Sequence, residues 1–313
     1  MISTIRALTS KPFNVNLFVL AKLLPEAEVV TRAQQRLAPF YEALHIEQPV
    51  APESFAEDFQ AQREAVLQAA PPVVSFTFGV LPRDQVAQFQ RAGSRVIGTA
   101  TTAAEARAWY DTGADFICAQ GAEAGGHRAT FMGDMEQACI GTIALVPQIA
   151  AAVPIPVISA GGLMDGRAIA ATLMLGAQAA QLGTAFLSCP ECKIAPAWKA
   201  ALQSANDNST RLTRSFSGRY ARGLVNQFMQ QMRPFEAEVP PYPVQNALTA
   251  PLRQAATHAG RAEFLSLWAG QGAAMSRIVP AAQLVTLLAS EMEQAVVKWT
   301  TVRADRILTH RAD

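Results

Sequence analysis

Residues 115–128 read DFICAQGAEAGGHR, an apolar run that leads directly into a glycine-rich segment. Short and almost wholly apolar runs are typical of strands buried on both faces of a parallel sheet. Gly125 and Gly126 allow the backbone to approach a flat ligand closely or to adopt a positive φ. His127 can exchange a proton near neutral pH, which suits a general base beside a bound ligand. The competing interpretation is a tight turn with a structural histidine, but the position after a buried strand, with Gln120 nearby, favours a functional site.

The segment belongs to a series of similar apolar runs that alternate with helical patterns. Thr102 and Glu105 predict a capping box at the start of one helix, and Asp165 predicts the cap of a helix over Arg167–Leu175. Alternating strands and helices imply parallel strands with right-handed crossovers, in a doubly wound sheet or a barrel. The predicted strands are Phe13–Val19, Val73–Phe78, Arg95–Thr99, Asp115–Ala119, Pro156–Ser159 and Ala179–Leu182.

Two later motifs favour the barrel. They are 158-ISAGGLMDGR-167 and 180-AQLGTAF-186, each a strand end followed by glycine. Backbone amides near Gly162 and Gly183 can point at one phosphate, as they do after the last two strands of many barrels. Thr184 can add a hydroxyl donor, and Gln181 can meet a polar edge of the ligand. Alternatively, the two glycines only permit tight packing of helix on strand. No G-x-G-x-x-G follows the first strand, which argues against a dinucleotide-binding sheet.

These three motifs resemble those of the nitronate monooxygenase family, formerly called 2-nitropropane dioxygenases. The similarity extends to KPFNVNLFV near the start and LWAGQGAAMSRIVPAAQLV near the end, so it covers the chain from about residue 4 onward. The resemblance implies an α/β fold of the TIM-type (β/α)8 barrel class with FMN as its cofactor. FMN-dependent enoyl-acyl-carrier-protein reductases share the first three motifs, so the superfamily is better defined than the reaction.

The resemblance also implies roles for particular residues. His127 matches the catalytic histidine, and the run Gly270, Gln271 and Gly272 matches a loop over the substrate side of the site. No metal is expected, because the Cys189-Pro-Glu-Cys192 pair lacks a second pair of ligands and is better explained as a turn. The expected cofactor-binding residues are Asn16, Gln120, Gly125, Gly126, Gly162, Gln181, Gly183 and Thr184.

The strand count falls short of a closed barrel. Eight βα units are expected and six are found, and the N-terminal strand with a Pro-Met loop that the resemblance implies is not in the sequence. We therefore expect a barrel that lacks its first two βα units, with a helical insertion after the last strand. We expect a single FMN-binding domain over 1–313, with a core of 11–187 and 251–313 and an insertion or lid of 188–250.

The function implied is FMN-dependent oxidation of nitronates or nitroalkanes by O2 to carbonyl compounds and nitrite. His127 would remove the α-proton of a neutral nitroalkane or position the nitronate. One alternative is an FMN-dependent NAD(P)H enoyl-ACP-type reductase. The other is an inactive, flavin-free fragment, because of the missing N-terminal units.

Composition limits the partners. The formal net charge of +1 gives no sign of the basic surface that binds nucleic acid. No apolar run is long enough to cross a membrane. We expect a small nitro compound and O2 as partners, with the oligomeric state open. Four cysteines and no signal-peptide pattern favour a location in the cytoplasm.

Arg219 and Arg222 could contact an anionic substrate or a phosphate, or they could be solvated loop charges.

Overall fold

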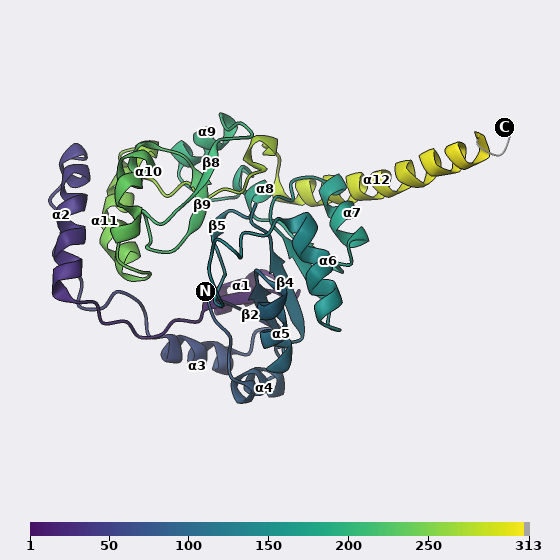
Figure 1. Cartoon of the computed structure of the whole chain (residues 1–313), viewed down its shortest axis with the longest axis horizontal. Helices are drawn as coiled ribbons and strands as arrows, with labels where there is room; N and C mark the ends of the chain where they lie inside the picture. Colours follow the sequence, from purple (N-terminus) through teal and green to yellow (C-terminus); the bar gives the residue numbers. More distant parts are fainter. Residues whose placement is uncertain (310–313) are drawn as a thin grey trace.

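A curved parallel sheet forms the centre of the molecule, in a computed structural model that describes residues 1–309 (Figure 1). All six predicted strands are confirmed, each within one or two residues of its expected ends. Neighbouring strands run parallel in chain order, so that β1 and β7 are the two edges of a half-barrel. The strands are β1 (Asn14–Phe18), β2 (Val73–Thr77), β3 (Arg95–Ala100), β4 (Phe116–Gln120), β6 (Val157–Ala160) and β7 (Ala179–Gln181).

The outer face of this sheet is apolar and is covered by helices. Phe76, Val96 and Ile117 point into this layer and are fully buried. Gly98 lets a helix come especially close, because a Cβ there would stand 2.2 Å from the Trp109 ring. The covering helices are α3 (Phe59–Ala69), α4 (Arg83–Arg91), α5 (Ala103–Asp111), α6 (Thr142–Ala152) and α7 (Gly166–Met174).

The inner face carries polar side chains beside a small apolar cluster of Ile97, Cys118 and Ala160, because alternate residues of a strand point to opposite sides of the sheet. Asn14 Nδ2 donates to Ser75 Oγ at 2.8 Å, and Ser75 Oγ donates to Asn16 Oδ1 at 2.9 Å. The hydroxyls of Thr77 and Thr99 continue this network at 3.1 Å. Small polar side chains fill less of the interior than the large apolar residues of a packed barrel, so the inner face is left open to a ligand.

Two predicted helix caps can be examined in detail. Asp165 Oδ1 accepts from Ala168 N at 2.9 Å and begins α7, as predicted. Thr102 Oγ1 accepts from Glu105 N at 3.1 Å and begins α5. However, the Glu105 carboxylate does not complete the capping box at Thr102. It accepts instead from Thr101 N at 2.6 Å and from Met132 N at 2.9 Å, which ties α5 to the chain that follows His127.

A second apolar core lies beside the sheet. The helix α2 comes from the long excursion after β1, yet it packs along α11 from the far end of the chain (Figure 1). Phe40 and Phe228 meet there with ring centroids 4.6 Å apart. The helices outside the sheet layer are α1 (Ile2–Leu8), α2 (Ala27–Ala43), α8 (Thr184–Leu187), α9 (Pro196–Gln203), α10 (Gln227–Met232), α11 (Val244–His258) and the 3-10 segments Arg233–Glu238, Ala262–Phe264 and Ala273–Met275.

The insertion at 188–250 is helical as predicted, but it also contains two strands that the sequence analysis did not identify. These strands are β8 (Thr210–Thr213) and β9 (Ala221–Leu224). They pair antiparallel, and β9 also pairs with the two-residue strand β5 (Gly126–His127). The glycine-rich motif is therefore joined to the insertion by backbone hydrogen bonds.

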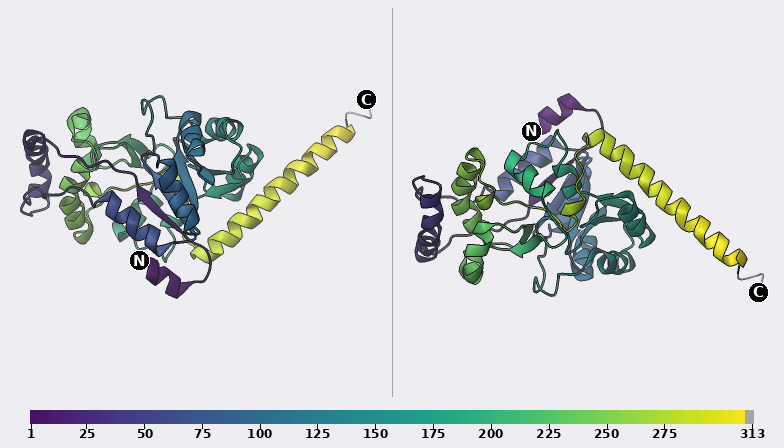
Figure 2. Two further views of the ribbon diagram at one scale, coloured as in Figure 1. Left: turned by 90° about the horizontal axis from the view of Figure 1, so that it is seen from below. Right: turned by 90° about the horizontal axis from the view of Figure 1, so that it is seen from above.

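The last helix, α12 (Ala281–Thr309), packs its first turns on α7 and then extends away from the body (Figure 2). Gly166 allows the close packing, because a Cβ there would stand 2.2 Å from Met292 N. Within residues 1–309, no helix is both long and apolar enough to span a bilayer.

Candidate active site

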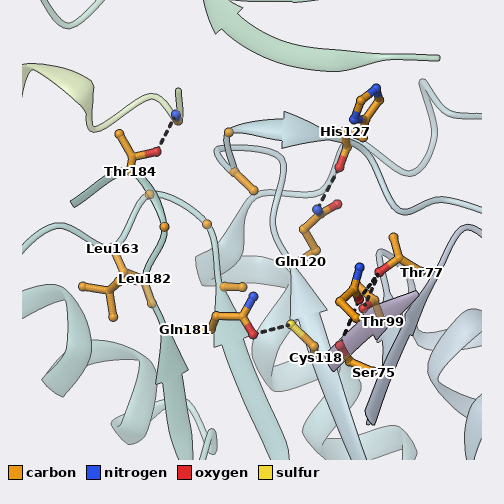
Figure 3. Close-up of a pocket in the computed structure, with 18 of the residues that line it drawn as sticks. Ser75, Thr77, Thr99, Cys118, Gln120, His127, Leu163, Gln181, Leu182 and Thr184 are labelled. Carbon is orange, nitrogen blue, oxygen red and sulfur yellow. Dashed lines mark hydrogen bonds between the residues drawn. The ribbon is translucent and has the colours of Figure 1, made fainter. Parts of the chain in front are cut away.

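A cavity of about 300 Å³ opens at the carboxyl ends of the parallel strands (Figure 3). This is the end of a βα-barrel at which active sites occur, and the volume lies within the range of small-ligand pockets. Gly126 and Gln271 belong to the same loops as the lining residues but do not line the cavity. Ten of the residues singled out in the sequence line it: Asn16, Gln120, Gly125, His127, Gly162, Gln181, Gly183, Thr184, Gly270 and Gly272.

One end of the cavity consists of glycine-containing backbone. Gly161 and Gly162 have φ values of 120° and 73°, which side-chain-bearing residues rarely adopt. No described atom lies within 4 Å of the position of a Cβ on Gly183, so a ligand can approach that backbone directly. Thr184 Oγ1 accepts from Gly270 N at 2.9 Å, so its hydroxyl also positions the 270–272 loop. Consecutive glycines at strand ends suit an anionic group, and these residues therefore fit the phosphate of a flavin nucleotide.

The same close packing continues around the glycine-rich motif. A Cβ on Gly125 would stand 2.5 Å from Gly270 N, and a Cβ on Gly272 would stand 2.4 Å from the Met164 side chain. Gln271 N donates to the Glu123 carbonyl at 2.9 Å. The 270–272 loop is therefore held against the motif by backbone contacts that larger residues would prevent.

Three polar side chains of the motif maintain its shape. Gln120 Nε2 donates to the His127 carbonyl at 3.0 Å, and its Oε1 accepts from Ala129 N at 2.9 Å. Glu123 accepts from Thr142 N at 2.9 Å and so caps α6. Arg128 is 1% exposed and donates to the Gly121 carbonyl at 2.6 Å. The role of Arg128 could not be predicted from the sequence, because nothing in its local context distinguishes a buried arginine from a solvated one.

His127 lies at the other end of the cavity from Thr184 (Figure 3). Its Nε2 is 2.9 Å from Ser217 Oγ. Four aromatic rings surround the imidazole, with centroids 5.5 to 6.5 Å away: Phe18, Phe78, Tyr242 and Trp268. These rings make the space beside the imidazole an apolar one.

Electrostatics around His127 correct one expectation. Burial lowers the pKa of His127 to about 4, and the nearby cations Arg219 and Arg253 contribute to that decrease. The imidazole is therefore neutral at pH 7, and it does not exchange a proton near neutral pH as its residue type alone had suggested. A neutral imidazole is the form that can accept a proton.

The two arginines are held by structure rather than solvated. Arg219 stacks over the Phe78 ring at 3.9 Å and donates to the Arg128 carbonyl at 2.9 Å, and burial lowers its pKa to about 10. Arg253 Nη2 donates to Asn246 Oδ1 at 3.0 Å, and burial lowers its pKa as well.

Other sequence features lie outside this site. Arg222 is 8% exposed, and its Nε donates to the Ala122 carbonyl at 3.0 Å. It therefore stabilises the glycine-rich motif without lining the cavity. Cys189 and Cys192 are free thiols that do not line the cavity. Within the described residues, no group of three or more potential metal ligands occurs.

Comparisons with known proteins agree with the site. The family model described as nitronate monooxygenase matches residues 1–291. A protein named as a probable nitronate monooxygenase from Staphylococcus aureus is 37% identical over 294 residues, which cover 94% of this chain and 83% of the relative.

Solved structures give the same result. The nitroalkane oxidase of Streptomyces ansochromogenes superposes with a TM-score of 0.88 at 42% identity, over 95% of this chain and 85% of that one. FabK from Thermotoga maritima superposes with a TM-score of 0.73 at 27% identity, over 96% and 82%. The parallel half-barrel thus matches the fold of these proteins over most of their length. The chain belongs to the nitronate monooxygenase family of flavin-dependent oxidoreductases.

Proposed function

We propose that this chain binds FMN and catalyses the oxidation of nitronates by O2 to carbonyl compounds and nitrite. The observation that carries the proposal is one cavity with a glycine-lined end for phosphate and a neutral histidine at the other end. The guanidinium groups of Arg219 and Arg253 act on that histidine electrostatically from outside the lining. When bound, FMN would accept electrons from the substrate and pass them to O2; that chemistry belongs to the cofactor.

The binding roles follow from the lining residues. Backbone amides near Gly162 and Gly183 would hold the phosphate, with Thr184 fixing the adjoining loop. Asn16 and Gln181 would offer polar atoms to the isoalloxazine edge. Because Gln120 is already engaged by the backbone of its own motif, we expect it to maintain the loop and to contact the flavin through its remaining N–H.

The electrostatics favour a nitronate anion over a neutral nitroalkane. Burial and the positive charges of Arg219 and Arg253 disfavour an imidazolium ion, so His127 is a weaker base than a free imidazole. The same two charges stabilise a substrate that arrives as an anion. His127 would then contact the nitronate through its ring, and it would act as a base only for neutral substrates.

The surroundings would control access to the site. We propose that the chain is a single domain in which 188–250 acts as a lid and the 270–272 loop closes the substrate side. Tyr242 and Trp268 beside His127 would exclude water from the reacting carbon.

We also propose a cytoplasmic location, with which the four free thiols are consistent.

The test is the visible absorption spectrum of the purified chain before and after anaerobic addition of propionate 3-nitronate. The proposal predicts flavin bands that bleach with the nitronate, FMN on release of the cofactor, and nitrite after air is admitted. Bleaching only by NADH or NADPH would support the enoyl-reductase alternative. A colourless protein to which added FMN does not bind would contradict the proposal.

A variant separates the two roles of His127. His127→Asn should lose most turnover of neutral nitroalkanes, by about 100-fold or more, because a positioned base contributes that much. It should lose less with preformed nitronates. His258→Asn is a matched control, since that histidine is exposed at the end of α11. Unchanged turnover of neutral nitroalkanes in His127→Asn would show that the histidine is not the base.

A further inference from the structure

His127 makes one side-chain hydrogen bond, and its partner determines which ring nitrogen carries the proton. The ring Nε2 lies 2.9 Å from Ser217 Oγ, and Ser217 is 1% exposed. A serine hydroxyl has a single proton to donate, whereas its oxygen can accept more than one hydrogen bond. The position of that proton therefore fixes the direction of the bond to the histidine.

A second contact of the same hydroxyl gives the direction. Ser217 Oγ is 3.0 Å from the Arg219 carbonyl oxygen, which can only accept. If the serine proton is donated to that carbonyl, Oγ must accept from Nε2–H of His127. The imidazole N–H, the serine hydroxyl and the Arg219 carbonyl then each have a hydrogen-bond partner.

The reverse arrangement is less favourable. A serine proton donated to Nε2 would remove this donor from the Arg219 carbonyl and place the imidazole proton on Nδ1. Within the described residues, Nδ1 of His127 has no hydrogen-bond partner. An Nδ1–H would have no acceptor among these residues, and the Arg219 carbonyl would lose its donor, whereas a free lone pair on Nδ1 needs no donor.

We propose that Ser217 is a positioning residue that holds His127 as the Nε2–H tautomer, so that Nδ1 is the atom that accepts a proton. The tautomer follows from the contacts of this chain alone. Its use in turnover rests on the proposed function.

The local backbone keeps the two residues together. Ser217 N and Gly218 N both donate to the Arg214 carbonyl, at 3.2 and 2.7 Å, in a tight turn. Gly218 has φ 81°, and a Cβ there would stand 2.1 Å from the Pro240 carbonyl oxygen. The chain then enters β9, which pairs with β5 at His127. The serine, in the turn that precedes β9, and the histidine, on β5, are thus held beside each other by one small sheet.

The direct test is a two-bond ¹H–¹⁵N correlation spectrum of the ¹⁵N-histidine-labelled protein at pH 7. The sequence has four histidines, and the His127 signals are those missing from the spectrum of His127→Asn. We expect a protonated Nε2 and an unprotonated Nδ1 for His127 in the unmodified protein. A protonated Nδ1 would overturn the proposal, with no variant required.

Variants test whether Ser217 is responsible. Ser217→Ala should move His127 towards a mixture of tautomers, and Ser217→Thr should restore the Nε2–H form. Ser215→Ala is the matched control, because Ser215 is buried in the same turn but its hydroxyl donates to Glu236 at 2.8 Å instead. An unchanged His127 spectrum in Ser217→Ala would contradict the assignment.

Turnover gives a second readout. With neutral nitroalkanes, Ser217→Ala should lower kcat about tenfold, restored by threonine, since one part of the contribution of a positioned base is lost. Turnover of preformed nitronates should fall less, because these substrates transfer no proton to His127. If the chain proved not to oxidise nitro compounds, the spectra would still decide the tautomer, so the failure of one proposal is distinguishable from that of the other.

Discussion

The depressed pKa of His127 makes the stability of the protein depend on pH in a predictable way. The pKa falls from 6.5 for a free imidazole to about 4 in the native state, so between these values the unfolded chain binds a proton that the folded chain does not. Stability therefore rises with pH across this window. The contribution of His127 is fully present above pH 6.5 and is lost as the pH falls to about 4. At about 1.4 kcal/mol per pH unit, His127 accounts for about 3 kcal/mol.

The assay is equilibrium urea denaturation of the unmodified protein and of His127→Asn at several pH values from 4 to 7. Carboxylates and other groups titrate equally in both proteins, so the difference between the two curves isolates His127. We expect the difference in unfolding free energy to change by about 3 kcal/mol, with the variant less sensitive to acid. Parallel curves would refute the reasoning, because they would mean that the imidazole titrates alike in the folded and unfolded chains.

Three further predictions concern the sheet and the cavity. Gly98→Ala should destabilise the fold by about 1 to 3 kcal/mol, because its Cβ would meet the Trp109 ring; an unchanged urea midpoint would contradict this. Thr184→Val should weaken FMN binding about five- to tenfold in a fluorescence titration, because Gly270 N loses its acceptor, and equal affinity would show that the hydroxyl has no role. Burial raises the pKa of Cys118 to about 12, so peptide mapping should find it unmodified by iodoacetamide at pH 8 until the protein unfolds.

The sheet could be predicted because its signals are local. Most of the strands are short apolar runs, such as Val73–Thr77, and each strand from β2 onward is followed by a segment with a helix cap or a glycine. Asp165 caps α7 as expected, since that hydrogen bond spans only three residues. The glycine-rich ends of β4, β6 and β7 could be brought together from sequence, because parallel strands place their carboxyl ends at one edge.

The surroundings of His127 could not be predicted in the same way. Ser217 is 90 positions from His127 in sequence, and β5 is only two residues long, so no periodic pattern marks their pairing. Arg219 was left open between a ligand contact and a solvated charge, and its stacking on Phe78 and its bond to the Arg128 carbonyl show that it is not a freely solvated charge. The pKa of His127 depends on such distant neighbours, which is why the expectation of titration near neutrality was wrong.

The pairing of β5 with β9 has a consequence for protein engineering. A chimera that exchanged residues 188–250 for the corresponding segment of a relative would also exchange the strand against which His127 is aligned and the serine that contacts it. Donor segments chosen for substrate preference alone would then shift the imidazole relative to the cavity. A successful graft has to retain Ser217 and the register Gly126–Arg222, because these contacts keep His127 in place when the substrate-binding segment is exchanged between family members.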